Sequence, residues 1–137
     1  MTASRKKRKT IQSPEGTHFF SPVADKALDG IILSRQGKII YANPSFKSMF
    51  NYNEKMIGDS LVNYILQEDA QQTALSLDTK SHVPDKSIIF ETAIRSKSGT
   101  MIPVELHNSL IEFENEPVVL TFISDISKRK NAEYILK

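Results

Sequence analysis

The sequence of 137 residues contains no cysteine and no tryptophan. The absence of cysteine excludes disulfide bridges, thiolate nucleophiles and metal sites with cysteine ligands. No apolar run approaches the roughly 18 residues that a membrane-spanning helix requires. The basic N-terminus is not followed by the apolar stretch of a secretory signal. We therefore expect one cytoplasmic domain that is stabilised by its own core, without cross-links.

Positive charge is concentrated at the N-terminus. Residues 5–9 read RKKRK and hold five of the 18 basic residues, so the rest of the chain has 13 basic and 16 acidic residues. A mildly acidic body lacks the basic face of a nucleic-acid-binding domain. We interpret residues 1–22 as a disordered basic leader and expect no nucleic-acid partner.

The most informative stretch runs from Lys38 to Gly58. It begins with a short β-branched and aromatic run, which favours a strand. Asn43 is a preferred N-cap, and Pro44 suits the first position of a helix. Apolar residues then follow at the spacing of one helical face: Phe46, Met49 and Phe50. We expect a strand that passes directly into two short helices, the second of which ends at Gly58.

The remaining patterns complete an α+β domain. Residues 30–34 and 38–42 form a predicted hairpin, further short helices are expected at 60–66 and 68–77, and alternating residues predict strands at 88–95, 101–111 and 118–124. The predicted order is β-β-α-α-α-α-β-β-β: a five-stranded antiparallel sheet with short helices over one face. We place the domain at residues 23–127. Residues 128–137 are the expected start of a C-terminal helix that continues beyond this sequence.

The order and spacing of several short motifs resemble the PAS domain family. The matching stretches are Asp29-Gly30-Ile31-Ile32, Tyr41-Ala42-Asn43-Pro44-Ser45-Phe46, Asn51-Tyr52, Lys97-Ser98-Gly99 and Asp125-Ile126-Ser127-Lys128-Arg129-Lys130. The resemblance covers about residues 24–130, although Asp125-Ile126-Ser127 stands where Asp-Ile-Thr is usual. It implies a sensory and interaction module of cytoplasmic signalling proteins, such as the sensor histidine kinases of two-component systems. The domain itself is not expected to be an enzyme.

The resemblance also implies a ligand pocket between the helices and the inner face of the sheet. Aligned on Gly99 and Asp125, its lining is Phe46, Phe50, Ile57, Leu61, Tyr64, Ile65, Phe90, Thr92, Ile94, Val104, Leu106, Asn108, Val119, Thr121 and Ile123. Thr92, Asn108, Thr121 and the Tyr64 hydroxyl are the polar anchors. The lining suits a small apolar or weakly polar ligand, but a filled core is the commoner use of such a face.

The two cofactors that this family commonly binds are disfavoured. The reactive cysteine of the flavin-binding members would fall at Leu61, and their flavin-binding amides would fall at Ile94, Val104 and Ile123, which cannot form hydrogen bonds. Haem-binding members place a histidine on the helix before the third strand, but no histidine lies between His18 and His82. We interpret His82 and His107 as solvated. We expect no cofactor, no metal, and either no ligand or an unknown small molecule.

Two further expectations concern partners and signalling. Ile31, Leu33, Leu120 and Phe122 form an apolar outer sheet face, which favours a homodimer through that face and the flanking helices. The resemblance implies that Asp125, Ser127 and Arg129 pass a signal to a covalently linked output domain. We expect Asp125 to pair with Arg129 or Lys130. The two hypotheses are a ligand sensor that signals through the Asp125 corner and a ligand-free dimerisation or protein-interaction module.

Overall fold

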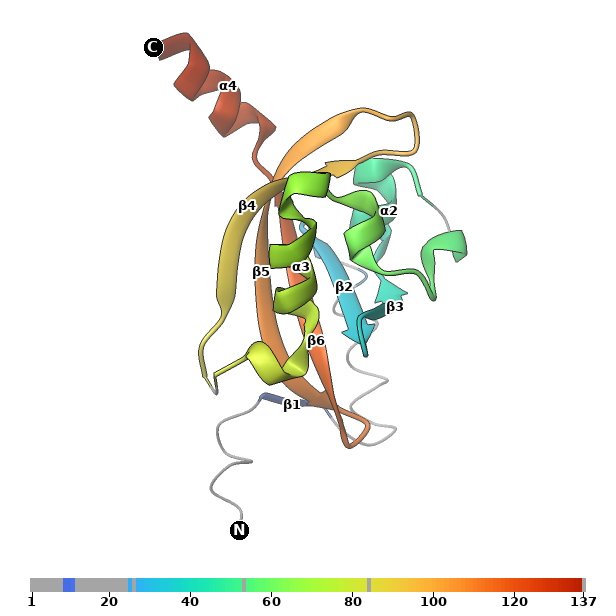
Figure 1. Cartoon of the computed structure of the whole chain (residues 1–137). Helices are drawn as coiled ribbons and strands as arrows, with labels where there is room; N and C mark the ends of the chain where they lie inside the picture. Colours follow the sequence, from blue (N-terminus) through green and yellow to red (C-terminus); the bar gives the residue numbers. More distant parts are fainter. Residues whose placement is uncertain (1–8, 12–24, 26, 53, 84, 137) are drawn as a thin grey trace.

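The computed structural model describes residues 9–11, 25, 27–52, 54–83 and 85–136 (Figure 1). In chain order its elements are β1 (Lys9–Ile11), β2 (Gly30–Arg35), β3 (Lys38–Ala42), α2 (Pro44–Phe50), the 3₁₀ helices η2 (Glu54–Met56), η3 (Leu61–Tyr64) and η4 (Gln67–Asp69), α3 (Ala70–Leu77), η5 (Thr79–Ser81), β4 (Ile88–Arg95), β5 (Met101–Phe113), β6 (Glu116–Asp125) and α4 (Ser127–Leu136). The expected order of two strands, short helices and three strands is confirmed.

The five expected strands form one antiparallel sheet. Neighbours along it are β5, β6, β2 and β3, and β4 pairs with the other edge of β5. The nearly uninterrupted apolar run in β6 is explained by its central place between β5 and β2. The strand β1 was not expected. It pairs in parallel with Ile111–Phe113 of β5, although residues 1–22 were predicted to lack regular structure. The rest of that leader lies outside the described residues.

Two tight turns connect the paired strands. Gln36 and Gly37 join β2 to β3 with φ of 52° and 79°, and Glu114 and Asn115 join β5 to β6 with φ of 53° and 65°. Two successive residues with positive φ are typical of primed turns, which match the right-handed twist of a hairpin. Arg35 lies within 3.6 Å of Glu114 and 3.5 Å of Glu116, so the two turns are held side by side.

Asn43 fixes the passage from the sheet into α2. Its Oδ1 accepts hydrogen bonds from the backbone N–H of Phe46 (3.0 Å) and of Ile31 (2.8 Å), so one side chain caps the helix and fixes β2. Asn51 ends the helix with φ of 60°. Gly30 permits the close approach of α2, because a Cβ at this position would lie 3.3 Å from the Phe46 side chain.

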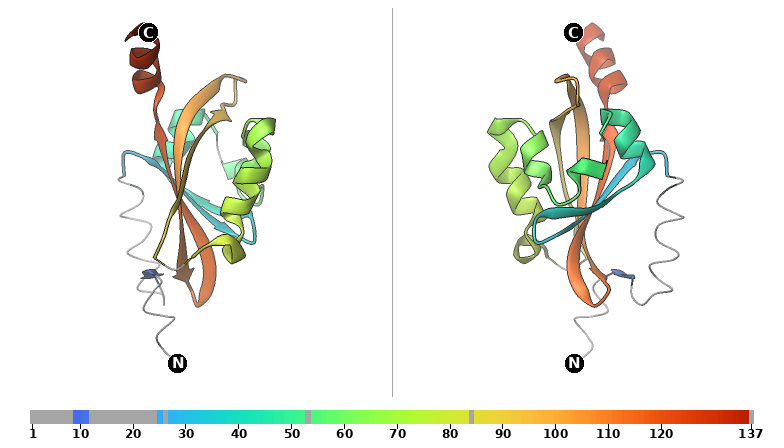
Figure 2. Two further views of the ribbon diagram at one scale, coloured as in Figure 1. Left: turned by 60° about the vertical axis from the view of Figure 1, so that its left-hand side comes forward. Right: turned by 90° about the vertical axis from the view of Figure 1, so that its right-hand side faces the viewer.

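The helices lie over one face of the sheet, and α4 projects from the end opposite the β5–β6 turn (Figures 1 and 2). The inner core lies between the helices and the sheet. A second apolar cluster lies on the outer face and consists of Ile31, Leu33, Ile111, Phe113, Val118 and Leu120. Leu33 and Leu120 are cross-strand partners, which confirms the predicted outer position of both.

Candidate functional site

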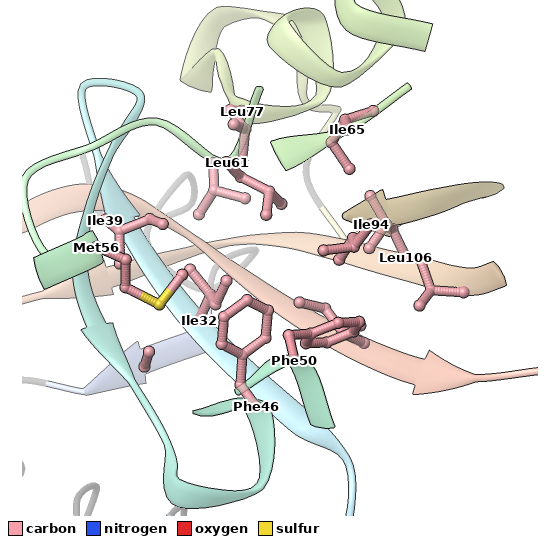
Figure 3. Packing of buried hydrophobic residues seen from close by; sticks show 14 residues of the cluster. Ile32, Ile39, Phe46, Phe50, Met56, Leu61, Ile65, Leu77, Ile94 and Leu106 are labelled. Atoms are coloured by element: carbon pink, nitrogen blue, oxygen red, sulfur yellow. The ribbon is translucent and has the colours of Figure 1, made fainter. Parts of the chain in front are cut away.

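The interior between helices and sheet is a packed apolar core. Nine of the predicted pocket residues belong to its buried cluster, namely Phe46, Phe50, Leu61, Ile65, Ile94, Val104, Leu106, Val119 and Ile123. Tyr64 and Phe90 are partly buried against it. Figure 3 shows the side chains from α2, η3 and α3 directed into the same space as those from the strands. Sequence reasoning missed Ile32, Ile39, Ala42, Met56 and Leu77, which belong to the same cluster.

Ile57 is not part of this interior, so its assignment to the pocket was wrong. Its side chain is 39% exposed, whereas the preceding Met56 is 2% exposed. Backbone hydrogen bonds explain why Met56, and not Ile57, is buried. The carbonyl of Ile39 accepts from Gly58 N–H (2.8 Å), and Ile39 N–H donates to the carbonyl of Asp59 (2.7 Å). These bonds fix the segment beside β3 with Met56 directed inward.

The predicted polar anchors of the pocket are hydrogen-bonded within the protein. The Thr121 hydroxyl donates to Asn108 Oδ1 (2.7 Å), and both side chains are fully buried. Asn108 Nδ2 donates to the carbonyl of Ile88 (3.2 Å), and the Thr92 hydroxyl donates to Asp69 Oδ2 (2.6 Å). Since each anchor already has a partner, a polar ligand would have to replace an existing hydrogen bond.

Tyr52 and Tyr64 close one side of the interior. Their rings lie 4.9 Å apart in an edge-on arrangement. The Tyr52 hydroxyl donates to the carbonyl of Arg95 (2.5 Å), and the Tyr64 hydroxyl donates to Asp59 Oδ2 (2.7 Å). Burial, followed by the hydrogen bond to Asp59, raises the pKa of Tyr64 to about 12. Both phenols are therefore neutral donors at physiological pH. Arg95 is exposed.

The two histidines of the described region lie in different environments. His107 is exposed on β5, as predicted. His82 was interpreted as solvated, but it is buried, and its Nε2 lies 2.7 Å from the carbonyl oxygen of Ser76. The cause is the turn η5, which carries the chain back against the end of α3. In the described part of the chain, no cluster of histidine, aspartate and glutamate side chains could hold a metal ion.

Residues Asp125, Ile126 and Ser127 form the corner that joins β6 to α4. Asp125 Oδ1 accepts hydrogen bonds from the backbone N–H of Ser127 (2.8 Å) and from its hydroxyl (2.6 Å). Ile126 is buried, and its N–H donates to the carbonyl of Pro103 on β5 (3.0 Å). The corner therefore attaches the first turn of α4 to two neighbouring strands. The Asp125 carboxylate also lies near the helix N-terminus, where negative charge is favourable.

Glu91 provides a second attachment between the sheet and α4. Its carboxylate pairs with Arg129 and with Lys130 Nζ (2.7 Å). The hydrogen bond from Lys130 is the main cause that lowers the pKa of Glu91, and the same bond raises the pKa of Lys130. The expected pairing of Asp125 with Arg129 or Lys130 was therefore wrong. Sequence reasoning could not find Glu91, because only strand register and helix direction bring β4 beside α4.

Two exposed apolar side chains flank an exposed histidine in a row across the outer face. Ile89 on β4 is opposite His107 on β5, and His107 is opposite Phe122 on β6. Ile89 is 51% exposed and Phe122 is 38% exposed. We call Ile89, His107 and Phe122 the outer row. It adjoins the buried outer cluster, because Phe122 is the cross-strand partner of Ile31.

A groove of about 420 Å³ lies away from the predicted pocket. It is bordered by the β2–β3 turn, the end of α3 and the start of β6. Its lining includes Arg35, Leu77, Asp78, Glu116 and Pro117. No helix in the described ranges combines the length and apolar character that a membrane crossing requires.

Solved structures with the same fold support this arrangement. The PAS domain of a protein from Colwellia psychrerythraea is 21% identical, with a TM-score of 0.70 over 82% of this chain and 98% of that chain. The PAS domain of an HTR-like protein from Haloarcula marismortui is 23% identical, with a TM-score of 0.68 over 83% and 100%. A domain of a sensory box sensor histidine kinase/response regulator from Geobacter sulfurreducens is 16% identical, with a TM-score of 0.62 over 80% and 93%.

A search of curated proteins finds no match. The sequence profile described as PAS domain matches residues 28–128, which begin just before β2 and end in the first turn of α4. This region contains the five antiparallel strands, the covering helices and the Asp125 corner. The chain therefore belongs to the PAS domain family, whose members are signal-sensing and transduction modules of signalling proteins.

Proposed function

We propose that this PAS domain passes a signal from its sheet to an output segment that follows α4. The observation that carries the proposal is the double attachment of the first turn of α4. Asp125 caps the turn from β6, and Glu91 pairs with Arg129 and Lys130 from β4. A change in the spacing or twist of these strands would shift both anchor points. The helix would then move as a unit, because packed elements switch between arrangements rather than deform continuously.

Hydrogen exchange of the α4 amides tests the attachment. Loss of the Asp125 cap in Asp125→Ala should expose the first turn of α4, because a cap of this kind stabilises a helix by about 1 kcal/mol. We expect roughly fivefold faster exchange there, with little change in the melting temperature of the domain. Asp78→Ala is the matched control, since Asp78 caps η5 in the same way through Lys80 N–H (2.9 Å). Equal exchange of α4 in the wild type and Asp125→Ala would contradict the proposal.

The input to this relay is proposed to be a protein contact on the outer sheet face, in the form of a homodimer. The exposed outer row supports this candidate. Phe122→Glu would place a charge in such an interface, so we expect it to weaken self-association at least tenfold in sedimentation equilibrium. Leu75→Glu, at a 53% exposed position on α3, is the control and should leave association unchanged. Dimerisation that is unaffected by Phe122→Glu would reject this interface.

A small apolar or weakly polar ligand in the interior is the second candidate input. The apolar character of the core favours it, whereas the hydrogen-bonded polar anchors weigh against it. Native mass spectrometry, together with an absorption spectrum, distinguishes the two. A reproducible extra mass without visible absorption would establish a ligand. A bare dimer mass would support the interaction module, and a visible chromophore would overturn the exclusion of flavin and haem.

A further inference from the structure

The strand β5 extends beyond the strand that covers its edge. β5 runs for 13 residues, but its pairing with β4 ends at Asn108. Residues 109–113 continue to pair with β6 on their other side. Their edge facing away from β6 therefore carries backbone donors and acceptors that β4 does not reach. Ile111 is fully buried, so this segment is an integral part of the sheet. Sheet edges of this kind attract further strands.

The strand β1 indicates what this edge accepts. It lies in parallel with β5, with Lys9, Thr10 and Ile11 beside Ile111, Glu112 and Phe113. The ladder is only three residues long and is parallel, and parallel pairing is the slightly weaker arrangement per residue. The edge is thus occupied by a short strand with few hydrogen bonds, which another strand of the same sequence can replace.

Charge complementarity favours a basic strand at this edge. β1 begins at Lys9, the last residue of the RKKRK run. The receiving end of the sheet carries Glu112 on β5, Glu114 in the turn and Glu116 at the start of β6. The acidic side chains therefore favour the binding of a positively charged strand at this edge.

The length of the connection allows the leader to reach a second molecule. Residues 12–29, 18 in number, separate β1 from β2. Such a segment can span up to about 60 Å when fully extended. That reach exceeds what pairing within one small domain requires, so the same strand can lie on its own β5 or on that of a neighbouring copy.

We propose that the edge formed by residues 109–113 of β5 docks the basic leader strand of a second copy of this chain. Two copies would exchange β1 reciprocally, which gives a closed symmetric dimer. This contact is separate from the outer row, since it uses a sheet edge rather than a sheet face. It assigns a role in assembly to residues 5–11, which read RKKRKTI.

Disulfide trapping tests the exchange directly, because the chain has no cysteine of its own. Thr10 and Glu112 are Cα partners in the β1–β5 ladder. Neighbouring strands lie about 4.8 Å apart, within the range of about 4.4–6.8 Å that a disulfide bridges. Full-length Thr10→Cys and Glu112→Cys chains are mixed, oxidised mildly and separated without reductant. We expect a cross-linked dimer containing one chain of each kind, with a yield that rises with protein concentration.

A control pair and the double variant make the result decisive. Thr10→Cys mixed with Ser48→Cys, at an exposed position on α2, should give no more than background dimer. Equal yields from both mixtures would overturn the proposal as random collision. A Thr10→Cys/Glu112→Cys chain that closes only within itself, with no dimer in the mixture, would show that the leader stays on its own sheet and would also overturn it. If no combination cross-links, residues 109–113 of β5 do not bind the leader strand, which would also overturn the proposal.

Salt dependence tests the electrostatic part of the proposal. Raising the ionic strength from 0.05 M to 0.5 M shortens the screening length several-fold, so the yield of the Thr10→Cys and Glu112→Cys dimer should fall. Glu116→Lys, introduced into the Glu112→Cys chain, should lower the yield in the same direction at low salt. Yields that are unchanged by both would overturn the role assigned to the acidic end of the sheet.

Discussion

Asn108 and Thr121 show how single residues determine what this interior can accept. Both are fully buried, and the Thr121 hydroxyl satisfies the Asn108 oxygen at 2.7 Å. Burial of an unpaired polar group is costly, so this pair is stable only while both members remain. The sequence correctly identified them as inward-facing, because strand alternation determines the face. It could not show that they bond to each other, because that depends on the register between β5 and β6.

Replacing one member of this pair should lower the free energy of unfolding more than replacing both. Thr121→Val removes the donor and leaves Asn108 Oδ1 buried without it, so we expect a loss of about 1–3 kcal/mol in the free energy of unfolding. Asn108→Leu/Thr121→Val removes both polar groups and should recover part of that loss. Urea denaturation of the two variants provides the measurement. A double variant that is no more stable than Thr121→Val alone would contradict this account of the pair.

Met56 and Ile57 test the corrected assignment of the η2 segment. Met56 is almost fully buried and Ile57 is 39% exposed. Met56→Ala should therefore lower the free energy of unfolding by about 2–5 kcal/mol, because it leaves a cavity among Ile39, Phe46 and its other neighbours. Ile57→Ala should cost about 0.5 kcal/mol or less. If Ile57→Ala lowered the stability more than Met56→Ala in thermal or chemical denaturation, the sequence-based assignment of Ile57 to the interior would be right.

At the scale of elements, local patterns predicted which segments form helices and strands, but not how the elements attach. The cap at Asn43 and the hairpin of residues 30–34 and 38–42 depend on local signals and were predicted correctly. The Glu91 attachment joins side chains that lie 38 and 39 positions apart in the sequence. The burial of Met56 in place of Ile57 depends on backbone hydrogen bonds to β3. Neither contact can be predicted from the local periodicity of the sequence.

The Glu91 attachment should depend on pH in a defined direction. The pKa of Glu91 is lowered in the folded domain, so its contribution is present above the unfolded value of about 4.3 and is lost as pH falls through the folded pKa. The pKa of Lys130 is raised, so its contribution persists at neutral pH and is lost only in strong alkali. We therefore expect α4 to loosen from β4 in acid, as the pH falls below the usual range of glutamate pKa values.

Carboxyl titration by NMR measures this dependence. The Glu91 pKa in the wild type should lie below the usual value, and in Lys130→Met it should move back toward it. Lys128→Met is the control, since Lys128 is an exposed lysine in the same turn of α4. High salt should reduce the difference, because both partners are about 42% exposed. Identical Glu91 titrations in the three proteins would contradict the attachment.

For the whole molecule, the fold was predictable because each level of the sequence agrees with the others. Alternation, helix caps and turn residues all favour one sheet with helices over one face, and the PAS resemblance follows the same order. The functional arrangement was less predictable. The interior was expected as a pocket, but its packing and internal hydrogen bonds resemble an ordinary core. The leader gave no periodic pattern, and a three-residue strand is too short to provide one.

The central claim is that strain in the sheet reaches α4 through the Asp125 corner. Ile123→Val removes one buried methyl-sized group from β6, two residues before Asp125. The most direct measurement is to compare backbone amide NMR shifts caused by Ile123→Val in the wild type and in Asp125→Ala. We predict that the shifts extend into the first turn of α4 in the wild-type background and are smaller there in Asp125→Ala, where only the Glu91 attachment and the Ile126 backbone hydrogen bond remain. Shifts in α4 that are equal in the two backgrounds, or absent from both, would contradict the relay.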